Sequence, residues 1–146
     1  MTAPIQRPRS SLAHSIYQLL NPIPFGFFVA ALIFDIVYFQ TAEMMWSKSA
    51  AWLITIGLFF AIIPRLINLV QVWIPRGRVV PGAEKADFGL NFIGILAAIL
   101  NAFIHSRDAY AVMPSGLILS VITVLCIALA TVIASTFYVP GRQSHV

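Results

Sequence analysis

Two charged residues lie inside long apolar runs of the chain, and their types could support acid–base or ionic chemistry. Asp35 falls in the first such run and Arg65 in the second. A charge at bilayer depth costs roughly 2.5–3.5 kcal/mol on insertion scales, so it usually faces a neighbouring helix and has a partner there. The pair could act as a proton or ion relay, or as the counter-charge of a ligand. Because a relay needs a chain of titratable groups and only one acid lies deep, we favour a structural ion pair.

Two asparagines could extend this pair into a polar cluster. Asn68 follows Arg65 by three residues, on the same face of a helix, and Asn91 is expected at a similar depth in the third run. The intramembrane polar cluster would then comprise Asp35, Arg65, Asn68 and Asn91. It could hold a small polar ligand or a lipid headgroup. We favour the simpler interpretation, in which the amides form hydrogen bonds between helices.

Asn101 and His105 are four residues apart and form a weaker candidate for a cofactor site. A histidine in a helical bundle can be an axial haem ligand, but a bis-histidine haem needs a second histidine at comparable depth. His14 and His145 lie outside the apolar runs, so we expect His105 to be an interfacial histidine. The sequence contains no metal-ligand spacing, P-loop, dinucleotide-binding glycine motif or serine nucleophile elbow. It therefore predicts no catalytic residue and no metal ligand, and it leaves any cofactor unknown.

The elements that must position these side chains are four apolar runs, each about long enough to cross a bilayer as a helix. They cover residues of about 24–40, 50–74, 87–105 and 114–139. Hydrophobic residues make up 60% of the 146-residue chain and charged residues 10%, whereas a soluble domain has about 25% charged residues. This composition excludes a soluble enzyme and a disordered chain. It predicts an all-α fold, an integral membrane bundle of four transmembrane helices.

The connections between the runs are short, which predicts antiparallel neighbours. We expect an N-terminal segment at 1–22 that is a candidate for an interfacial helix, a four-span domain at 23–139 and a tail at 140–146. Six Lys or Arg residues fall on the side of the two termini and two on the other side. The positive-inside rule then predicts that both termini are cytoplasmic. The net charge of +4 belongs to these membrane loops, and no nucleic acid is expected as a partner.

Depth estimates bring Asp35 and Arg65 together. With a rise of about 1.5 Å per residue, Asp35 lies about 16 Å and Arg65 about 13 Å from the cytoplasmic ends of their runs. Ala31 and Gly57 share helix faces with them, and small residues allow helices to pack closely. We therefore expect the effects of substituting the two charged residues to be coupled. Ser120, a small polar residue of the fourth run, is interpreted as a helix-packing position.

Several short motifs match a known family. Residues 14–18 read His-Ser-Ile-Tyr-Gln and residues 22–26 read Pro-Ile-Pro-Phe-Gly. In these features the chain resembles a bacterial inner-membrane family of four-helix proteins that is described as a domain of unknown function. Its members open with His-Pro-x-His-Pro and then have Pro-x-Gly at the start of the first span. Asp35 matches an acid common late in that span, and Asn91 matches the asparagine of a His-x-x-x-Asn motif in the third.

The chain also departs from the family pattern. Residues 64–68 read Pro-Arg-Leu-Ile-Asn where the family tends to read Pro-Gly-Leu-Ile-Asp, and Tyr17 and Asp87 stand where the family has histidine. The resemblance covers most of the chain and implies the four-span topology. Through the family's histidines it implies a haem or metal role for typical members, and two of those three positions differ here.

These features predict a multi-pass protein of the bacterial inner membrane, most simply a non-catalytic accessory or interaction subunit of a membrane complex. Its expected partners are membrane lipids and other membrane subunits, or a second copy of itself. The alternative is a small intramembrane redox protein holding haem b or a quinone, or a transporter of ions or small solutes. Absence of internal repeats and of broken helices weakens the transport alternative.

Overall fold

The computed structural model describes residues 20, 22–73, 82–107 and 109–137; the side chains of residues 67–73, 83, 84, 109 and 137 lie outside this description. In chain order its elements are the α-helices and one 3-10 helix, namely α2 (Pro22–Thr41), α3 (Met44–Trp73), α4 (Gly82–His105), η1 (Ala109–Ala111) and α5 (Ser115–Phe137). The expected interfacial helix within 1–22 and the tail at 140–146 lie outside the described residues. The elements of the described part are all helical.

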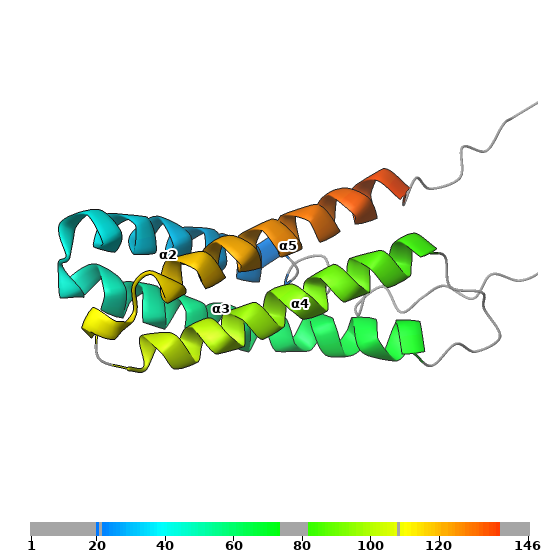
Figure 1. The fold of residues 1–146 in the computed structure, drawn as a ribbon. Helices are drawn as coiled ribbons and strands as arrows, with labels where there is room; N and C mark the ends of the chain where they lie inside the picture. The colour runs from blue at the N-terminus through cyan, green and yellow to red at the C-terminus, as the bar shows by residue number, and fades with distance from the viewer. Residues whose placement is uncertain (1–19, 21, 74–81, 108, 138–146) are drawn as a thin grey trace, which may run out of the picture.

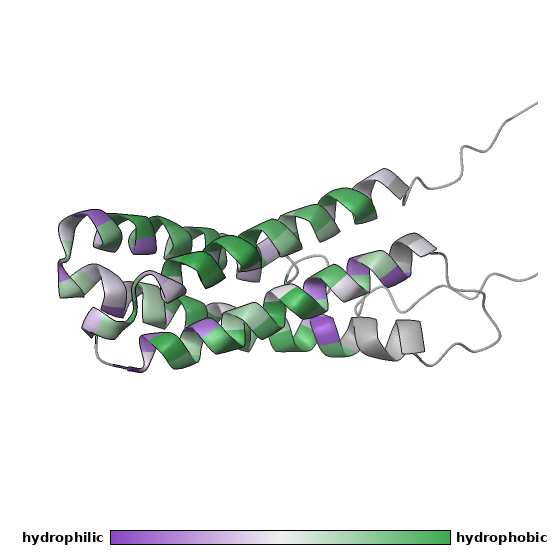
Figure 2. Cartoon of the chain, in the orientation of Figure 1, coloured by the Kyte–Doolittle hydropathy of each residue, from purple (hydrophilic) through white to green (hydrophobic). Residues whose placement is uncertain are grey.

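Each of the helices α2 to α5 is long and apolar enough to cross a membrane. Their large apolar side chains point outward: Trp52, Phe59 and Phe103 are 70%, 69% and 67% exposed. Figure 2 shows hydrophobic residues along all four helices, as expected for helices that contact lipid on one side and protein on the other. A helix satisfies its backbone hydrogen bonds internally, which the hydrocarbon core requires. The predicted all-α fold with four membrane-length helices is confirmed.

The four helices form a bundle in which neighbours along the chain run antiparallel (Figure 1). α2 packs against α3 and α5, and α4 packs against α5 and α3. Glycines allow the closest approaches. A Cβ at Gly57 of α3 would lie 2.9 Å from the ring of Phe28 in α2, and a Cβ at Gly94 of α4 would lie 2.9 Å from Ile127 in α5. The bundle is therefore held by two glycine-mediated helix pairs, α2 with α3 and α4 with α5.

The helices differ in length, and this decides which polar residues can meet. α2 has 20 residues, whereas α3 has 30. Both meet at the tight turn around Ala42, which adopts a φ of 55°. α3 therefore continues well beyond the level at which α2 begins, together with the start of α4 and the end of α5 (Figure 1). At that end the described bundle has three helices, and at the end near Ala42 it has four.

Candidate functional site

Asp35 lies fully buried in α2 and makes two hydrogen bonds to other helices. Its Oδ1 atom is 2.9 Å from Nε2 of His105, the last residue of α4. Its Oδ2 atom accepts a hydrogen bond of 2.5 Å from the hydroxyl of Ser120 in α5. One carboxyl group therefore joins three helices at the four-helix end of the bundle.

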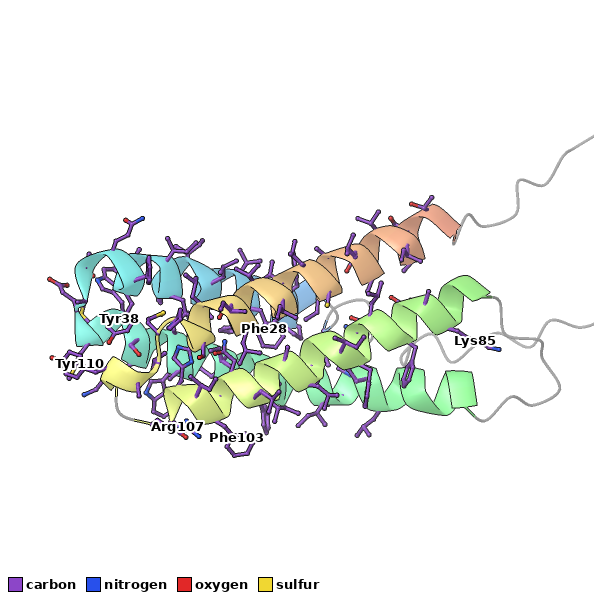
Figure 3. The ribbon with its side chains drawn as sticks, viewed as in Figure 1. Phe28, Tyr38, Lys85, Phe103, Arg107 and Tyr110 are labelled. Atoms are coloured by element: carbon purple, nitrogen blue, oxygen red, sulfur yellow. The ribbon has the colours of Figure 1, made fainter. Side chains whose placement is uncertain are left out.

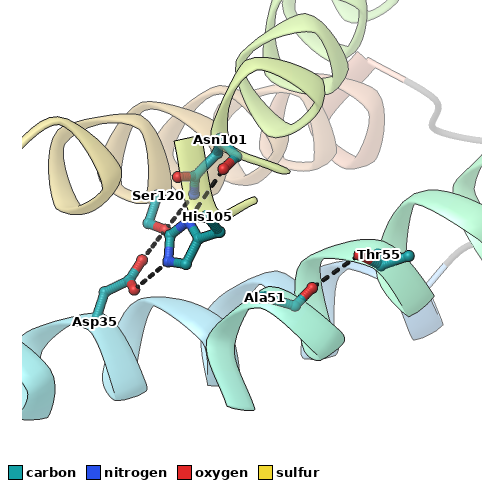
Figure 4. Close-up of polar contacts among 6 residues, drawn as sticks. All are labelled: Asp35, Ala51, Thr55, Asn101, His105 and Ser120. Carbon is teal, nitrogen blue, oxygen red and sulfur yellow. Dashed lines mark hydrogen bonds and ion pairs between the residues drawn. The ribbon is translucent and has the colours of Figure 1, made fainter. Parts of the chain in front are cut away.

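The two partners of Asp35 are themselves held in place by Asn101. The Asn101 Nδ2 atom donates to Ser120 Oγ at 2.7 Å, and Nδ1 of His105 is 3.0 Å from the backbone carbonyl oxygen of Asn101. A spacing of four residues places Asn101 and His105 on one face of α4, one turn apart. We call these four residues the Asp35 network; Figure 4 shows its hydrogen bonds.

The partners fix where the hydrogens of the Asp35 network lie. A carbonyl oxygen only accepts, so His105 Nδ1 carries a hydrogen and donates it to Asn101. Ser120 accepts from the Asn101 amide, so it gives its own hydrogen to Asp35. One hydrogen then remains between His105 Nε2 and Asp35 Oδ1. Whichever atom holds it, Asp35 and His105 together carry no net charge, which suits a site inside a membrane.

The segment before α5 covers the site. Val112 is fully buried, and the side chains of both His105 and Asp35 are completely shielded. A Cβ at Gly116 would lie 2.7 Å from Val112 Cγ1 and 3.0 Å from His105 Cε1, so glycine is what lets the first turn of α5 reach the imidazole. The ring of His105 does not face outward, because a carboxylate on a neighbouring helix holds it inside the bundle.

The residues around His105 do not fit an axial haem site. Such a ligand needs a ring nitrogen free for iron, and both nitrogens of His105 have partners in the protein. Turning the ring to free Nε2 would take from the buried Asp35 carboxyl one of its two hydrogen-bond partners. Within the described ranges, no three His, Cys, Asp or Glu side chains come close enough to hold a metal ion.

Asp35 and Arg65 lie at different levels of the bundle. Phe28 of α2 faces Gly57 of α3, and from this contact Asp35 and Arg65 lie two turns away in opposite directions. The separation along the bundle is about 22 Å at about 1.5 Å per residue. The expected pairing of Asp35 with Arg65 is therefore wrong. The sequence estimate counted both depths from the cytoplasmic ends of the apolar runs and assumed that these ends lie at the same level. In the structure α3 extends far beyond the start of α2.

The remaining members of the predicted cluster lie at the three-helix end. The Asn91 amide donates to both the backbone oxygen and the Oδ1 atom of Asp87, each at 2.9 Å, within its own helix. Asn68 belongs to α3, one turn beyond Arg65, and its side chain lies outside the described residues. Among the asparagine bonds described, the one between helices comes from Asn101.

The fold and the site together define a multi-pass α-helical membrane protein with a buried polar network joining three of its spans. The chain belongs to a family described as "Predicted membrane protein (DUF2231)", whose model matches residues 13–137. The predicted membership of a family of unknown function is thereby confirmed. The comparisons found no match among curated proteins and none among solved structures.

Ser120 is the network member that the sequence did not single out as a site residue. Serine is common at helix-packing positions, and nothing adjacent in the chain distinguishes Ser120 from other small residues of α5. The usable signal was the combination of one deep acid with the Asn101 and His105 spacing. A buried carboxylate near a single histidine needs a further donor, and α5 offers hydroxyls at this level.

Proposed function

We propose that the protein is a non-catalytic accessory or interaction subunit of a complex in the bacterial inner membrane, with both termini in the cytoplasm. The observation that carries this proposal is the tight packing of the central space among the described helices. The central space lined by Ala31, Ile54 and Ala98 has no room for a water molecule. A substrate therefore does not fit in this space, and the outer surface of the described helices remains for contacts with other molecules.

The outer surface suits contacts with lipid and with other transmembrane helices. Large apolar side chains are exposed on all four helices, among them Phe39 of α2, Phe59 of α3, Phe103 of α4 and Leu125 of α5. Figure 3 shows Phe103 and Tyr110 pointing away from the bundle. The partners proposed for this surface are membrane lipids and other membrane subunits, or a second copy of the chain.

Site-specific photo-crosslinking in native membrane tests the proposal. A photoreactive amino acid is placed at Phe39, Phe59, Phe103 or Leu125, and a matched control carries it at Ile54, which is buried in the bundle. The proposal expects a discrete protein adduct from at least one outward position and none from Ile54. Lipid adducts alone at every outward position, together with a strict monomer in mild detergent, would overturn it.

The redox or transport alternative has less support. The Asp35 network begins at an amide and ends at a backbone carbonyl, and neither group passes a proton onward at neutral pH. The central space beside Asn101 and Ser120 is also too narrow for water, so a solute cannot pass at this level of the described bundle. The absorption spectrum of protein purified from its native membrane decides the haem case, because a Soret band would replace our proposal with the redox one. Proton or solute flux in proteoliposomes decides the transport case.

A further inference from the structure

Two buried polar atoms beside Ser120 have no hydrogen-bond partner in the described part of the chain. They are Oδ1 of Asn101 and Oγ1 of Thr123, and both side chains line the narrow central space together with Ser120. Thr123 is unusual among the described threonines, because the others bond to a carbonyl oxygen four residues earlier, as in Thr41, Thr55, Thr131 and Thr136. Buried polar atoms normally find partners. The Asp35 network thus has spare acceptors on one side.

The free acceptor of Asn101 allows the hydrogen bonds that link Asn101, Ser120 and Asp35 to run in either direction. In the structure Asn101 donates to Ser120, and Ser120 donates to Asp35. In the reverse direction a protonated Asp35 would donate to Ser120, and Ser120 would donate to Asn101 Oδ1 after the amide has turned over. Asn101 Oδ1 has no partner in the structure. Turning the amide therefore breaks one hydrogen bond, from Asn101 Nδ2 to Ser120, and the bond from Ser120 to Oδ1 takes its place. The amide oxygen and nitrogen are similar in size, so the turn needs little extra space.

We propose that the Asp35 network is a proton-binding site with two hydrogen-bonded states. A proton from the aqueous phase forms an O–H bond at Asp35 Oδ2, and no bond between heavy atoms forms or breaks. His105 then keeps both ring hydrogens and donates Nε2–H to Asp35 Oδ1. The net charge of the Asp35 and His105 pair rises from zero to +1. This inference does not depend on the proposed function, since it concerns uptake at one site and not passage across the membrane.

The surroundings leave Asp35 and His105 as the groups that take up this proton. On α2 the nearest other titratable group is the buried Tyr38, one turn from Asp35. α5 contains no acidic or basic residue. Glu43 of the turn between α2 and α3, Lys48 of α3, Arg107 and Tyr110 are exposed to solvent at this end of the bundle. Arg65 and Asp87 lie at the other end. The proton reaches the site most directly from the end at His105, where Val112 and the first turn of α5 cover the ring.

Infrared spectroscopy of the full chain in lipid nanodiscs, recorded against pH, tests the site. We expect a carboxylic C=O stretching band to grow on acidification while the helical circular dichroism signal stays intact. The band should shift with ¹³C-labelled aspartate, persist in Asp87→Asn, and be absent from Asp35→Asn. In Asp35→Asn the amide can still accept from Ser120 and donate to Nε2 of a neutral His105, so the variant should fold.

Measurements at Asn101 and Ser120 test the direction of the hydrogen bonds in the Asp35 network. The side-chain amide signals of Asn101 in NMR spectra should change with the same pH midpoint as the Asp35 band. Ser120→Ala removes the hydroxyl that joins Asp35 to Asn101, so the Asn101 signals of this variant should no longer follow the Asp35 band. Thr131→Val, whose hydroxyl bonds only within α5, should titrate like the wild type. No Asp35 band at any pH at which the protein stays helical would overturn the proposal. So would wild-type Asn101 signals that ignore the Asp35 midpoint, or Asn101 signals of Ser120→Ala that still follow it.

Discussion

The effect of replacing the buried Asp35 on the free energy of unfolding should depend on whether the new side chain can form hydrogen bonds. Asp35→Asn should lower the free energy of unfolding by less than about 1 kcal/mol, since an amide can serve both Ser120 and His105. Asp35→Leu should lower it by about 3–5 kcal/mol, because it leaves buried partners without an acceptor. Denaturation in mixed micelles, followed by circular dichroism, measures both. Equal losses for the two variants would mean that the site needs the negative charge itself.

A double-mutant cycle at Asp35 and Arg65 tests the separation of these residues. At about 22 Å apart they share no partner in the bundle, so the effects of Asp35→Asn and Arg65→Gln on unfolding free energy should add to within about 0.5 kcal/mol. The matched cycle of Asp35→Leu with His105→Leu should give a coupling of about 0.5–3 kcal/mol, as residues in contact do. Strong coupling in the first cycle would contradict the register observed between α2 and α3.

At the residue scale, the sequence identifies the unusual side chains better than their partners. Asp35 and His105 could be singled out because charged or titratable groups are costly in lipid. The pairing could not, because it depends on how far each helix extends and how it is rotated. Depths counted from the ends of the apolar runs hide the ten extra residues of α3. The same error placed Asp35 with Asn91 instead of with Asn101.

At the element scale, a glycine at a helix contact and a glycine away from one should respond differently to substitution by alanine. Gly116→Ala should destabilise the protein by about 1–3 kcal/mol, because its methyl group would overlap Val112 and press on the His105 ring. Gly26→Ala is the matched control, since no other helix of the described part places an atom within 4 Å of its Cβ position. Alanine also favours a helix over glycine by about 1 kcal/mol. Thermal unfolding in detergent should therefore separate the two variants in opposite directions. A stabilised Gly116→Ala would show that α5 does not approach His105 this closely.

The helices themselves were predictable because lipid allows few alternatives. A run of about 20 apolar residues must satisfy its backbone internally, and this requirement outweighs local helix breakers. Pro64 lies inside α3 and does not end it, although proline usually breaks helices in water. The start of α3 at Met44 extends beyond the apolar run, because the tight turn at Ala42 leaves room for another helical turn of amphipathic sequence.

At the scale of the whole molecule, composition decides the class, and side-chain packing decides whether the interior is open. With 60% hydrophobic residues the chain could be assigned to the membrane before any element was located. What composition could not provide is the state of the interior. Whether four spans enclose a cavity or pack shut depends on side-chain volumes at particular contacts, such as Gly57 with Phe28 and Gly94 with Ile127.

The orientation of the whole bundle is the last prediction, and it follows from charge alone. With six basic residues on one side and two on the other, the positive-inside rule puts residue 85 in the cytoplasm and residue 106 outside. In a Cys126→Ala background, Ser106→Cys should react with a membrane-impermeant maleimide in intact cells, whereas Lys85→Cys should react only after lysis. Both positions are exposed in the bundle, so failure to react reflects the membrane and not burial. The opposite pattern would mean an inverted protein, and labelling of both in intact cells would mean that six basic residues are too few to fix one orientation.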